Sequence, residues 1–176
     1  MIDSITLDMT GAGSGILRFR QTLALPREQA FPFFADAGNL ARITPAEMGF
    51  EITSAQPIVM RAGALIDYRL RVWGLPMRWR TVISRWDPPN EFVDEQLRGP
   101  YAEWIHRHRF SDAGNGGTLM EDEVRFRLPF GVLGAVAAPL IRWQLRRIFE
   151  HRHRAVEAAL SSSGAAATPA GGSRLR

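Results

Sequence analysis

The sequence predicts an α+β domain in which a curved antiparallel sheet of about six to seven strands wraps around one long C-terminal helix. Two observations support this prediction. Between residues 65 and 127, several segments alternate apolar with polar side chains and are separated by turn residues, which is typical of an antiparallel meander. Residues 132–160 instead repeat apolar side chains at helical spacing, and only this element is long enough to cover the apolar face of the sheet.

The N-terminal part is predicted to hold one strand and two short helices. Residues 1–15 end in the glycine-rich stretch GAGSG, which indicates a flexible segment ahead of the folded domain. Residues 16–25 alternate and predict the first strand. Pro26 suits the first turn of a following helix, and Asp36 is placed to cap a second short helix that ends before Pro45.

Six further strands, one long helix and a tail complete the chain. The predicted strands are residues 50–54, 65–73, 77–86, 92–97, 99–110 and 118–127. The helix at residues 132–160 contains Pro139, which predicts a kink. Residues 161–176 carry few bulky apolar side chains and are predicted to be disordered. The folded unit is therefore expected to be one domain over residues 16–160.

The strand at residues 99–110 carries the most chemistry. Its inward face holds Trp104, His106, His108 and Phe110. A turn rich in glycine, GNGG, follows and leads into the next strand, so the two strands form a hairpin. If Phe110 pairs with Thr118, then His106 lies opposite Asp122, and an imidazole meets a carboxylate on a largely apolar face.

The pair of His106 and Asp122 has two interpretations. In the first, Asp122 fixes the tautomer of the imidazole and raises its pKa, and His106 acts as an acid and base or donates a hydrogen bond to a ligand. In the second, the two groups are a buried polar pair that sets strand register. The sequence leaves both open.

Large flat side chains and inward polar groups indicate the walls of a ligand pocket. The candidate ligand-binding residues are Tyr68, Trp79, Gln96, Tyr101, Trp104, His106, His108 and Asp122. Asp94 shares the predicted inward face with Gln96. The alternative is core packing for the aromatic residues, and a strand end in contact with water for Gln96 and Asp94.

The pattern His106-x-His108, with Asp122 across the hairpin, raises the question of a metal site, because sets of two histidines and one carboxylate bind zinc or iron. The two histidines are expected to lie about 6.5–7 Å apart along the strand. That separation predicts no metal at this position, and no cofactor is expected.

Composition excludes several kinds of chemistry. The chain has no cysteine, and all 22 basic residues are arginine. Zinc–thiolate sites, cysteine nucleophiles and lysine Schiff bases are therefore excluded. The net charge is only +4, and no nucleic-acid-reading motif accompanies it, so nucleic-acid binding is not expected. The N-terminus lacks the pattern of a signal peptide, and a cytoplasmic location is expected.

The most apolar part of the chain begins at Pro129 and ends at Leu140. It lies beside a group of arginines on the C-terminal helix, a combination that indicates a transient contact with a membrane surface. The alternative is a buried helix start with a solvated flank. The oligomeric state is not predicted.

Four stretches resemble bacterial ligand-binding proteins of the START-like, or SRPBCC, superfamily, which are often described as polyketide cyclase/dehydrase-like. They are NLARITP at residues 39–45, GPYAEWIHRHRF at 99–110, GTLMEDEVRFRLPFG at 117–131 and IFEHR at 148–152. The resemblance covers roughly residues 16–160 and implies the helix-grip fold. It provides no catalytic motif.

Three functions follow from the resemblance and the predicted pocket. The first is a non-catalytic carrier or sensor for a small hydrophobic or aromatic ligand, such as a lipid, quinone or polyketide-like molecule, held between the sheet and the C-terminal helix. The second is a cyclase or dehydratase that uses His106 and Asp122. The third is a protein-interaction module whose cavity is incidental.

Overall fold

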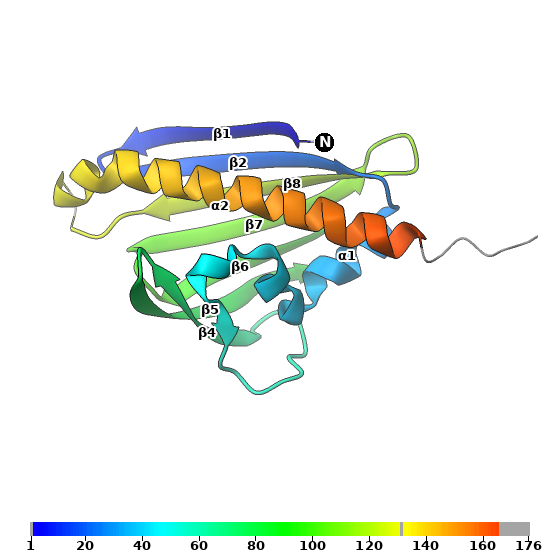
Figure 1. Cartoon of the computed structure of the whole chain (residues 1–176), viewed down its shortest axis with the longest axis horizontal. Helices are drawn as coiled ribbons and strands as arrows, with labels where there is room; N and C mark the ends of the chain where they lie inside the picture. Colours follow the sequence, from blue (N-terminus) through cyan, green and yellow to red (C-terminus); the bar gives the residue numbers. More distant parts are fainter. Residues whose placement is uncertain (1, 131, 166–176) are drawn as a thin grey trace, which may run out of the picture.

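The computed structural model describes the backbone of residues 2–130 and 132–165, and the side chains of residues 4–130 and 136–160. One long helix lies across the concave face of a curved antiparallel sheet, and short helices cover the same face farther down (Figure 1). The elements are β1 (Ile2–Gly11), β2 (Ser14–Leu23), α1 (Arg27–Ala35), η1 (Ala37–Ile43), η2 (Ala46–Met48), β3 (Glu51–Ile52), β4 (Leu65–Val72), β5 (Leu75–Asp87), β6 (Glu91–Arg98), β7 (Glu103–Asp112), β8 (Thr118–Arg127) and α2 (Val132–Ala165).

The sheet confirms the predicted fold class and adds to the strand count. Its order is β1-β2-β8-β7-β6-β5-β4-β3, an 8-stranded sheet where six to seven strands were expected. Every neighbouring pair is antiparallel. Because β2 pairs with β8, the N-terminal hairpin is joined to the end of the meander and α2 is left free to cross the sheet.

The additional strand is β1, which corrects the prediction of a flexible segment over residues 1–15. It pairs with β2 through a tight turn in which Gly13 has a φ of 76°. Ile5, Leu7 and Met9 pack in part against the core around Leu17. The glycines therefore form a tight turn between two paired strands, because glycine adopts the left-handed conformation at little cost. They do not make the segment flexible.

The β7–β8 hairpin has the predicted faces but a different register. Asp112 pairs with Thr118, so His108 lies opposite Asp122 and His106 lies opposite Val124. The predicted pairing of Phe110 with Thr118 is wrong by two residues. The connection is shorter than expected because side chains close it: the Asp112 carboxylate accepts a hydrogen bond of 2.7 Å from the Gly114 amide.

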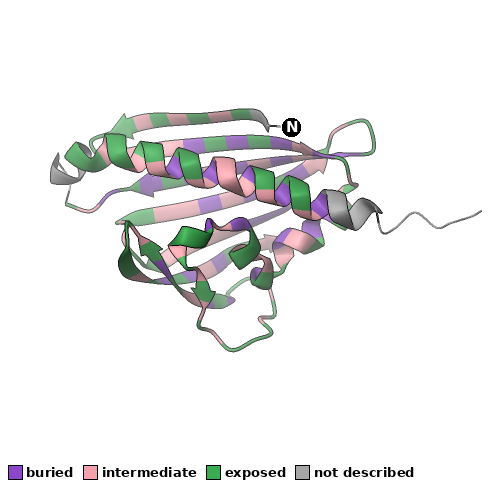
Figure 2. Cartoon of the chain, in the orientation of Figure 1, coloured by how far each residue is buried: buried purple, intermediate pink, exposed green. Residues whose placement is uncertain are grey.

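The concave face of the sheet carries the core. In Figure 2, buried residues alternate with less buried ones along β2, β7 and β8. One part of the core packs Leu17, Phe19, Val124 and Phe126 against Leu145 and Phe149 of α2. A second part joins α1 to the sheet through Phe31, Phe34, Phe92 and Phe110. The sheet is therefore closed at one end by α1, while α2 crosses its middle.

The short helices after β2 form where they were predicted. Pro26 directly precedes the first residue of α1, and Pro32 is accommodated within it. Asp36 caps η1 by accepting a 2.8 Å hydrogen bond from the Gly38 amide, as predicted. Thr44 ends η1. These elements hold η1 opposite the outer strands of the sheet.

Helix α2 extends farther than predicted. It continues through Pro139 and reaches Ala165, so residues 161–165 are helical where a disordered tail was expected. The remainder of the predicted tail, residues 166–176, lies outside the described residues. Among the described residues, no helix is both long and apolar enough to cross a bilayer.

Candidate functional site

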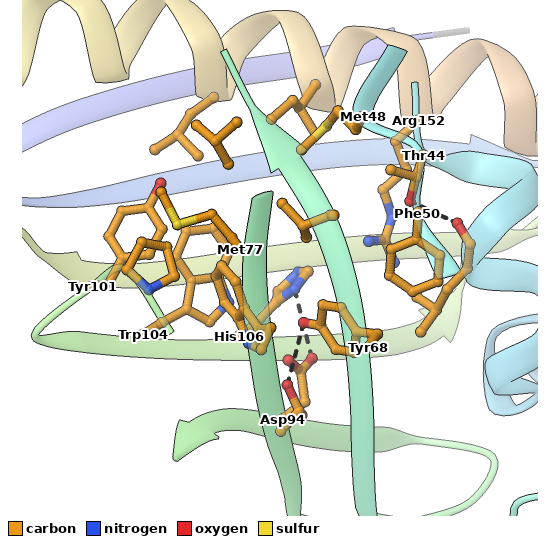
Figure 3. A pocket seen from close by; sticks show the side chains of 18 of the residues that line it. Thr44, Met48, Phe50, Tyr68, Met77, Asp94, Tyr101, Trp104, His106 and Arg152 are labelled. Carbon is orange, nitrogen blue, oxygen red and sulfur yellow. Dashed lines mark hydrogen bonds and ion pairs between the residues drawn. The ribbon is translucent and has the colours of Figure 1, made fainter. Parts of the chain in front are cut away.

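A cavity of about 550 Å³ lies between the concave face of the sheet, η1 and α2. This volume is within the range of small-molecule sites. Its walls are mostly apolar and come from α1, η1, η2, the strands β4 to β7, α2 and the segments that connect them. Figure 3 shows Tyr101, Trp104 and Met77 at one end of the cavity, and Thr44, Met48, Phe50 and Arg152 at the other, with Tyr68, Asp94 and His106 between them.

The predicted aromatic residues line this cavity and contact one another. Trp79 stacks on Tyr68 with ring centroids 5.8 Å apart, and it meets Trp104 edge to face at 5.5 Å. Tyr101 packs on Trp104 at 4.8 Å. Because each ring is held by its neighbours, this end of the cavity is a pre-formed surface for a flat apolar group. Their part in binding stays a prediction.

Two of the candidate ligand-binding residues do not line the cavity. The Gln96 amide donates a 2.7 Å hydrogen bond to the Tyr101 carbonyl and accepts one of 3.3 Å from the Tyr101 amide. Gln96 therefore holds the β6–β7 turn and positions Tyr101, because its side chain bends back to its own connection. Asp122 is fully enclosed behind the wall and reaches the cavity only through the histidines.

In the middle of the cavity wall, two carboxylates and two imidazoles form a largely buried cluster. Asp122 Oδ1 lies 2.7 Å from His108 Nδ1 and 3.4 Å from His106 Nε2. Asp94 Oδ2 accepts a hydrogen bond of 2.8 Å from His108 Nε2 and lies 3.6 Å from His106 Nδ1. The predicted pair of His106 with Asp122 is thus part of a larger cluster, in which the shorter Asp122 contact belongs to His108.

The two imidazoles lie much closer together than strand spacing suggests. Their ring centroids are 3.8 Å apart, with an angle of 39° between the planes. The rings lean toward one another because Asp94 and Asp122 contact both of them. His108 is also stacked on Phe92 at 4.0 Å, which fixes its orientation. The separation of about 6.5–7 Å expected from strand geometry therefore holds for the backbone and not for the rings.

Contacts within the cluster decide where its charges lie. Burial alone would raise the pKa of Asp122, but the His108 and His106 imidazoles hold that pKa well below its usual range. Burial opposes ionisation of Asp94 too, yet the hydrogen bond from His108 lowers its pKa. Burial and the charge of His108 lower the pKa of His106. Burial acts in the same direction on His108, but Asp122 and Asp94 outweigh it and raise the pKa of His108. The cluster therefore favours ionised carboxylates on Asp94 and Asp122, and it favours proton uptake by His108 over His106.

Sequence reasoning did not find Arg152, which projects from α2 into the cavity (Figure 3). Its Nε is buried without a hydrogen-bond partner. Tyr68 lies nearby with its hydroxyl 3.3 Å from Thr81 Oγ1, and burial raises the pKa of Tyr68, so the phenol stays neutral. The inward face of α2 was predicted from the spacing of its apolar residues alone, and this spacing gives no signal for an arginine on that face. Arg152 and the Tyr68 hydroxyl are polar groups available to a ligand.

The mouth of the cavity carries exposed apolar side chains. Trp73, Leu75 and Phe130 line the cavity and are 51%, 61% and 82% exposed. Trp73 and Gly74 form the β4–β5 turn with φ values of 50° and 78°, so the turn lies one residue earlier than the sequence indicated. A bulky residue is strained in this left-handed conformation, which suggests that Trp73 is placed for a purpose other than stability.

Residues 46–160 match the model of a protein family described as a domain of unknown function, DUF8410. The chain belongs to the DUF8410 family. That match covers β3 to β8 and most of α2, and therefore the buried cluster and Arg152. No curated protein matches the DUF8410 chain in sequence.

Solved structures show the fold of this DUF8410 protein. Protein Ms6760 from Mycobacterium smegmatis is 14% identical, with a TM-score of 0.67 over 93% of this chain and 99% of that chain. A START superfamily protein from the same organism is 15% identical, with a TM-score of 0.61 over 84% and 97%. The major latex-like protein 151 of Panax ginseng is 11% identical, with a TM-score of 0.58 over 84% and 97%. The chain has the START-like, or SRPBCC, helix-grip fold, as the sequence resemblance implied.

Proposed function

We propose that this DUF8410 protein binds a small hydrophobic or aromatic ligand in the cavity and acts as a non-catalytic carrier or sensor. The observation that carries the proposal is a cavity of about 550 Å³ with apolar and aromatic walls in the middle of the domain. A ligand that buries about 300 Å² of apolar surface gains about 7 kcal/mol from leaving water, before the cost of association. Micromolar affinity corresponds to about 8 kcal/mol after that cost, so polar contacts must add to the apolar burial.

The polar groups in the wall favour a ligand with one polar end. His106 lies next to Trp104, the Tyr68 hydroxyl follows, and Arg152 lies at the far end of the cavity (Figure 3). A flat or aliphatic body would rest against Trp79 and Trp104, and an oxygen-bearing end would reach Arg152. A lipid, a quinone or a polyketide-like molecule has this distribution of polar and apolar atoms.

The first test is native mass spectrometry of the purified protein, followed by solvent extraction. A discrete additional mass that is released unchanged supports a carrier or sensor. A bound molecule that is recovered in chemically altered form would instead favour the cyclase or dehydratase alternative. Protein without added mass, and without a thermal shift across a panel of lipids and quinones, would favour the interaction module.

Filling the cavity should weaken binding without a large effect on the fold. Leu70 is a buried cavity residue on β4, and Arg71 beside it is exposed on the opposite face. We expect Leu70→Trp to weaken binding of the fluorescent apolar probe 1-anilinonaphthalene-8-sulfonate about ten-fold or more, whereas Arg71→Trp leaves it unchanged. Equal affinity of the two variants would contradict binding of the probe in this cavity.

Trp73 at the mouth is expected to serve ligand entry at some cost in stability. Trp73→Asn should raise the free energy of unfolding by about 0.5–1 kcal/mol, because asparagine accepts the left-handed turn conformation. The same change should slow uptake of the probe from lipid vesicles in stopped-flow fluorescence. Leu97→Asn is the control, since Leu97 is 60% exposed and does not line the cavity. Unchanged uptake by Trp73→Asn would remove Trp73 from the entry route.

The exposed mouth also bears on the predicted membrane contact through residues 129–140. Phe130, Val136 and Leu140 are exposed within that segment, and Phe130 lines the cavity. Contact of this rim with a lipid surface would let an apolar ligand enter without crossing water. The vesicle experiment with Trp73→Asn tests this route as well, when the rate of probe uptake is followed as the vesicle concentration is raised. Transfer through water would give a rate that does not depend on the vesicle concentration.

A further inference from the structure

The buried cluster has the arrangement of a metal-binding site. Asp94 Oδ2, His106 Nδ1 and His108 Nε2 face one another, and one ligating atom from each residue lies within 4.8 Å of the others. All three side chains line the cavity. They come from two neighbouring strands, β6 and β7, in which Asp94 pairs directly with His106. The three groups are therefore held by sheet hydrogen bonds and not by a flexible loop.

Asp122 supplies a second, independent observation. Its Oδ1 contacts the other nitrogen of each ring, His108 Nδ1 at 2.7 Å and His106 Nε2 at 3.4 Å. A histidine that binds a metal through one nitrogen donates the N–H of the other to a carboxylate or carbonyl, which fixes its tautomer. Here a single carboxylate, fully enclosed by the protein, lies beside that nitrogen in both histidines, and neither contact has hydrogen-bond geometry before an ion binds.

The distances suit a small divalent cation. Bonds of about 2.0–2.2 Å at tetrahedral angles place ligand atoms about 3.4 Å apart. The two contacts of Asp94 Oδ2, 2.8 Å to His108 and 3.6 Å to His106, lie on either side of that value. Side-chain adjustments of less than about 1 Å would therefore complete the site.

We propose that Asp94, His106 and His108 bind a divalent transition-metal ion, zinc(II) or iron(II), and that Asp122 orients both imidazoles from behind. Two histidines and one carboxylate are a ligand set that these ions use, and they leave coordination positions open. The ion takes the place of the direct contact between His108 Nε2 and Asp94 Oδ2. The two positive charges of the ion balance the Asp94 and Asp122 carboxylates, whose ion pairs within the described residues are with His106 and His108.

The open positions face the cavity, because Asp94, His106 and His108 line it and Asp122 lies behind them. An oxygen donor on a cavity ligand, such as a carbonyl or hydroxyl, could then coordinate the ion. This inference goes beyond the proposed function and does not depend on it, since an ion can bind whether or not the cavity takes an organic ligand.

The test uses the full-length protein, freed of metal with a chelator, and cobalt(II) and zinc(II) as probes. We expect one equivalent of cobalt(II) to give the intense visible absorption of a low-coordinate site, and zinc(II) to displace it. His106→Gln and Asp94→Asn should each weaken zinc binding about 100-fold or more in competition with a chromophoric chelator. His151→Gln on α2 is the matched control, because it removes an imidazole outside the cluster and should leave affinity unchanged.

A second measurement on the wild-type protein avoids the risk that a cluster variant fails to fold. Long-range ¹H–¹⁵N spectra of the zinc-loaded protein should show opposite tautomers, with the proton on Nε2 in His106 and on Nδ1 in His108. Unchanged ring nitrogens after addition of zinc(II), or stoichiometric binding that survives both His106→Gln and Asp94→Asn, would overturn the proposal. Absence of binding at millimolar zinc(II) would do the same, and would leave the apolar-probe experiments unaffected.

Discussion

Replacing Asp122 with asparagine is expected to lower the free energy of unfolding by about 3–5 kcal/mol, because it removes one partner from a buried ion pair. Asp122 is 1% exposed, and its carboxylate lies 2.7 Å from His108, whose pKa the two carboxylates raise. The substitution keeps the shape of the side chain and removes its charge, so His108 is left with Asp94 as its one carboxylate partner. Urea denaturation in the presence of EDTA measures the loss without a contribution from bound metal.

Glu123→Gln is the matched control for this prediction. Glu123 is the next residue on β8, points to the outer face, and pairs there with Arg18 at 3.1 Å and Arg125 at 3.0 Å. The change again turns a carboxylate into an amide, but water solvates what remains, and a loss of less than about 1 kcal/mol is expected. Similar losses for the two variants would mean that the inner cluster is no more enclosed than the outer pairs.

Residue alternation was enough to predict which side chains share the inward face of a strand, although it could not predict their partners or show that Gln96 and Asp122 stay out of the cavity. Trp104, His106, His108 and Phe110 share the inward face of β7 as expected. The observed partner of Asp122 differs from the predicted one because a shift of the hairpin register by two residues keeps every side chain on the same face. Only the hydrogen bonds of the turn distinguish the two registers, and the Asp112 carboxylate that closes the turn gives no periodic signal.

The remaining parts of the site depend on packing between distant segments. The inward position of Asp94 was predicted, but its contacts with both histidines follow from the pairing of β6 with β7 and from the tilt of the rings. Arg152 reaches the cavity because α2 crosses the sheet at one particular angle and rotation. Neither the angle nor the rotation is encoded in the 3.6-residue period, which shows that one face of a helix is buried but not against which residues.

Phe110→Ala should produce the other large effect, a loss of about 3–5 kcal/mol in the free energy of unfolding. Phe110 is 2% exposed and lies between the sheet and α1, with its ring 5.1 Å from that of Phe34 and 5.3 Å from that of Phe31. Removing the ring costs its transfer energy and leaves a cavity that the flanking rings can fill only in part. The midpoint of urea denaturation should fall with an unchanged slope.

The same variant connects the packing of α1 with ligand binding. Phe34 lines the ligand cavity as well as contacting Phe110, and η1 follows α1 directly in the chain. A looser α1 should therefore weaken binding of the apolar probe in addition to lowering stability.

Phe130→Ala is the control for Phe110→Ala. It removes an equally large ring that is 82% exposed, and it should change the free energy of unfolding by less than about 0.5 kcal/mol. A loss below about 1 kcal/mol for Phe110→Ala would mean that α1 is not packed on the sheet through this ring. Reduced stability with unchanged probe affinity would instead separate the closure of the fold by α1 from the shape of the cavity.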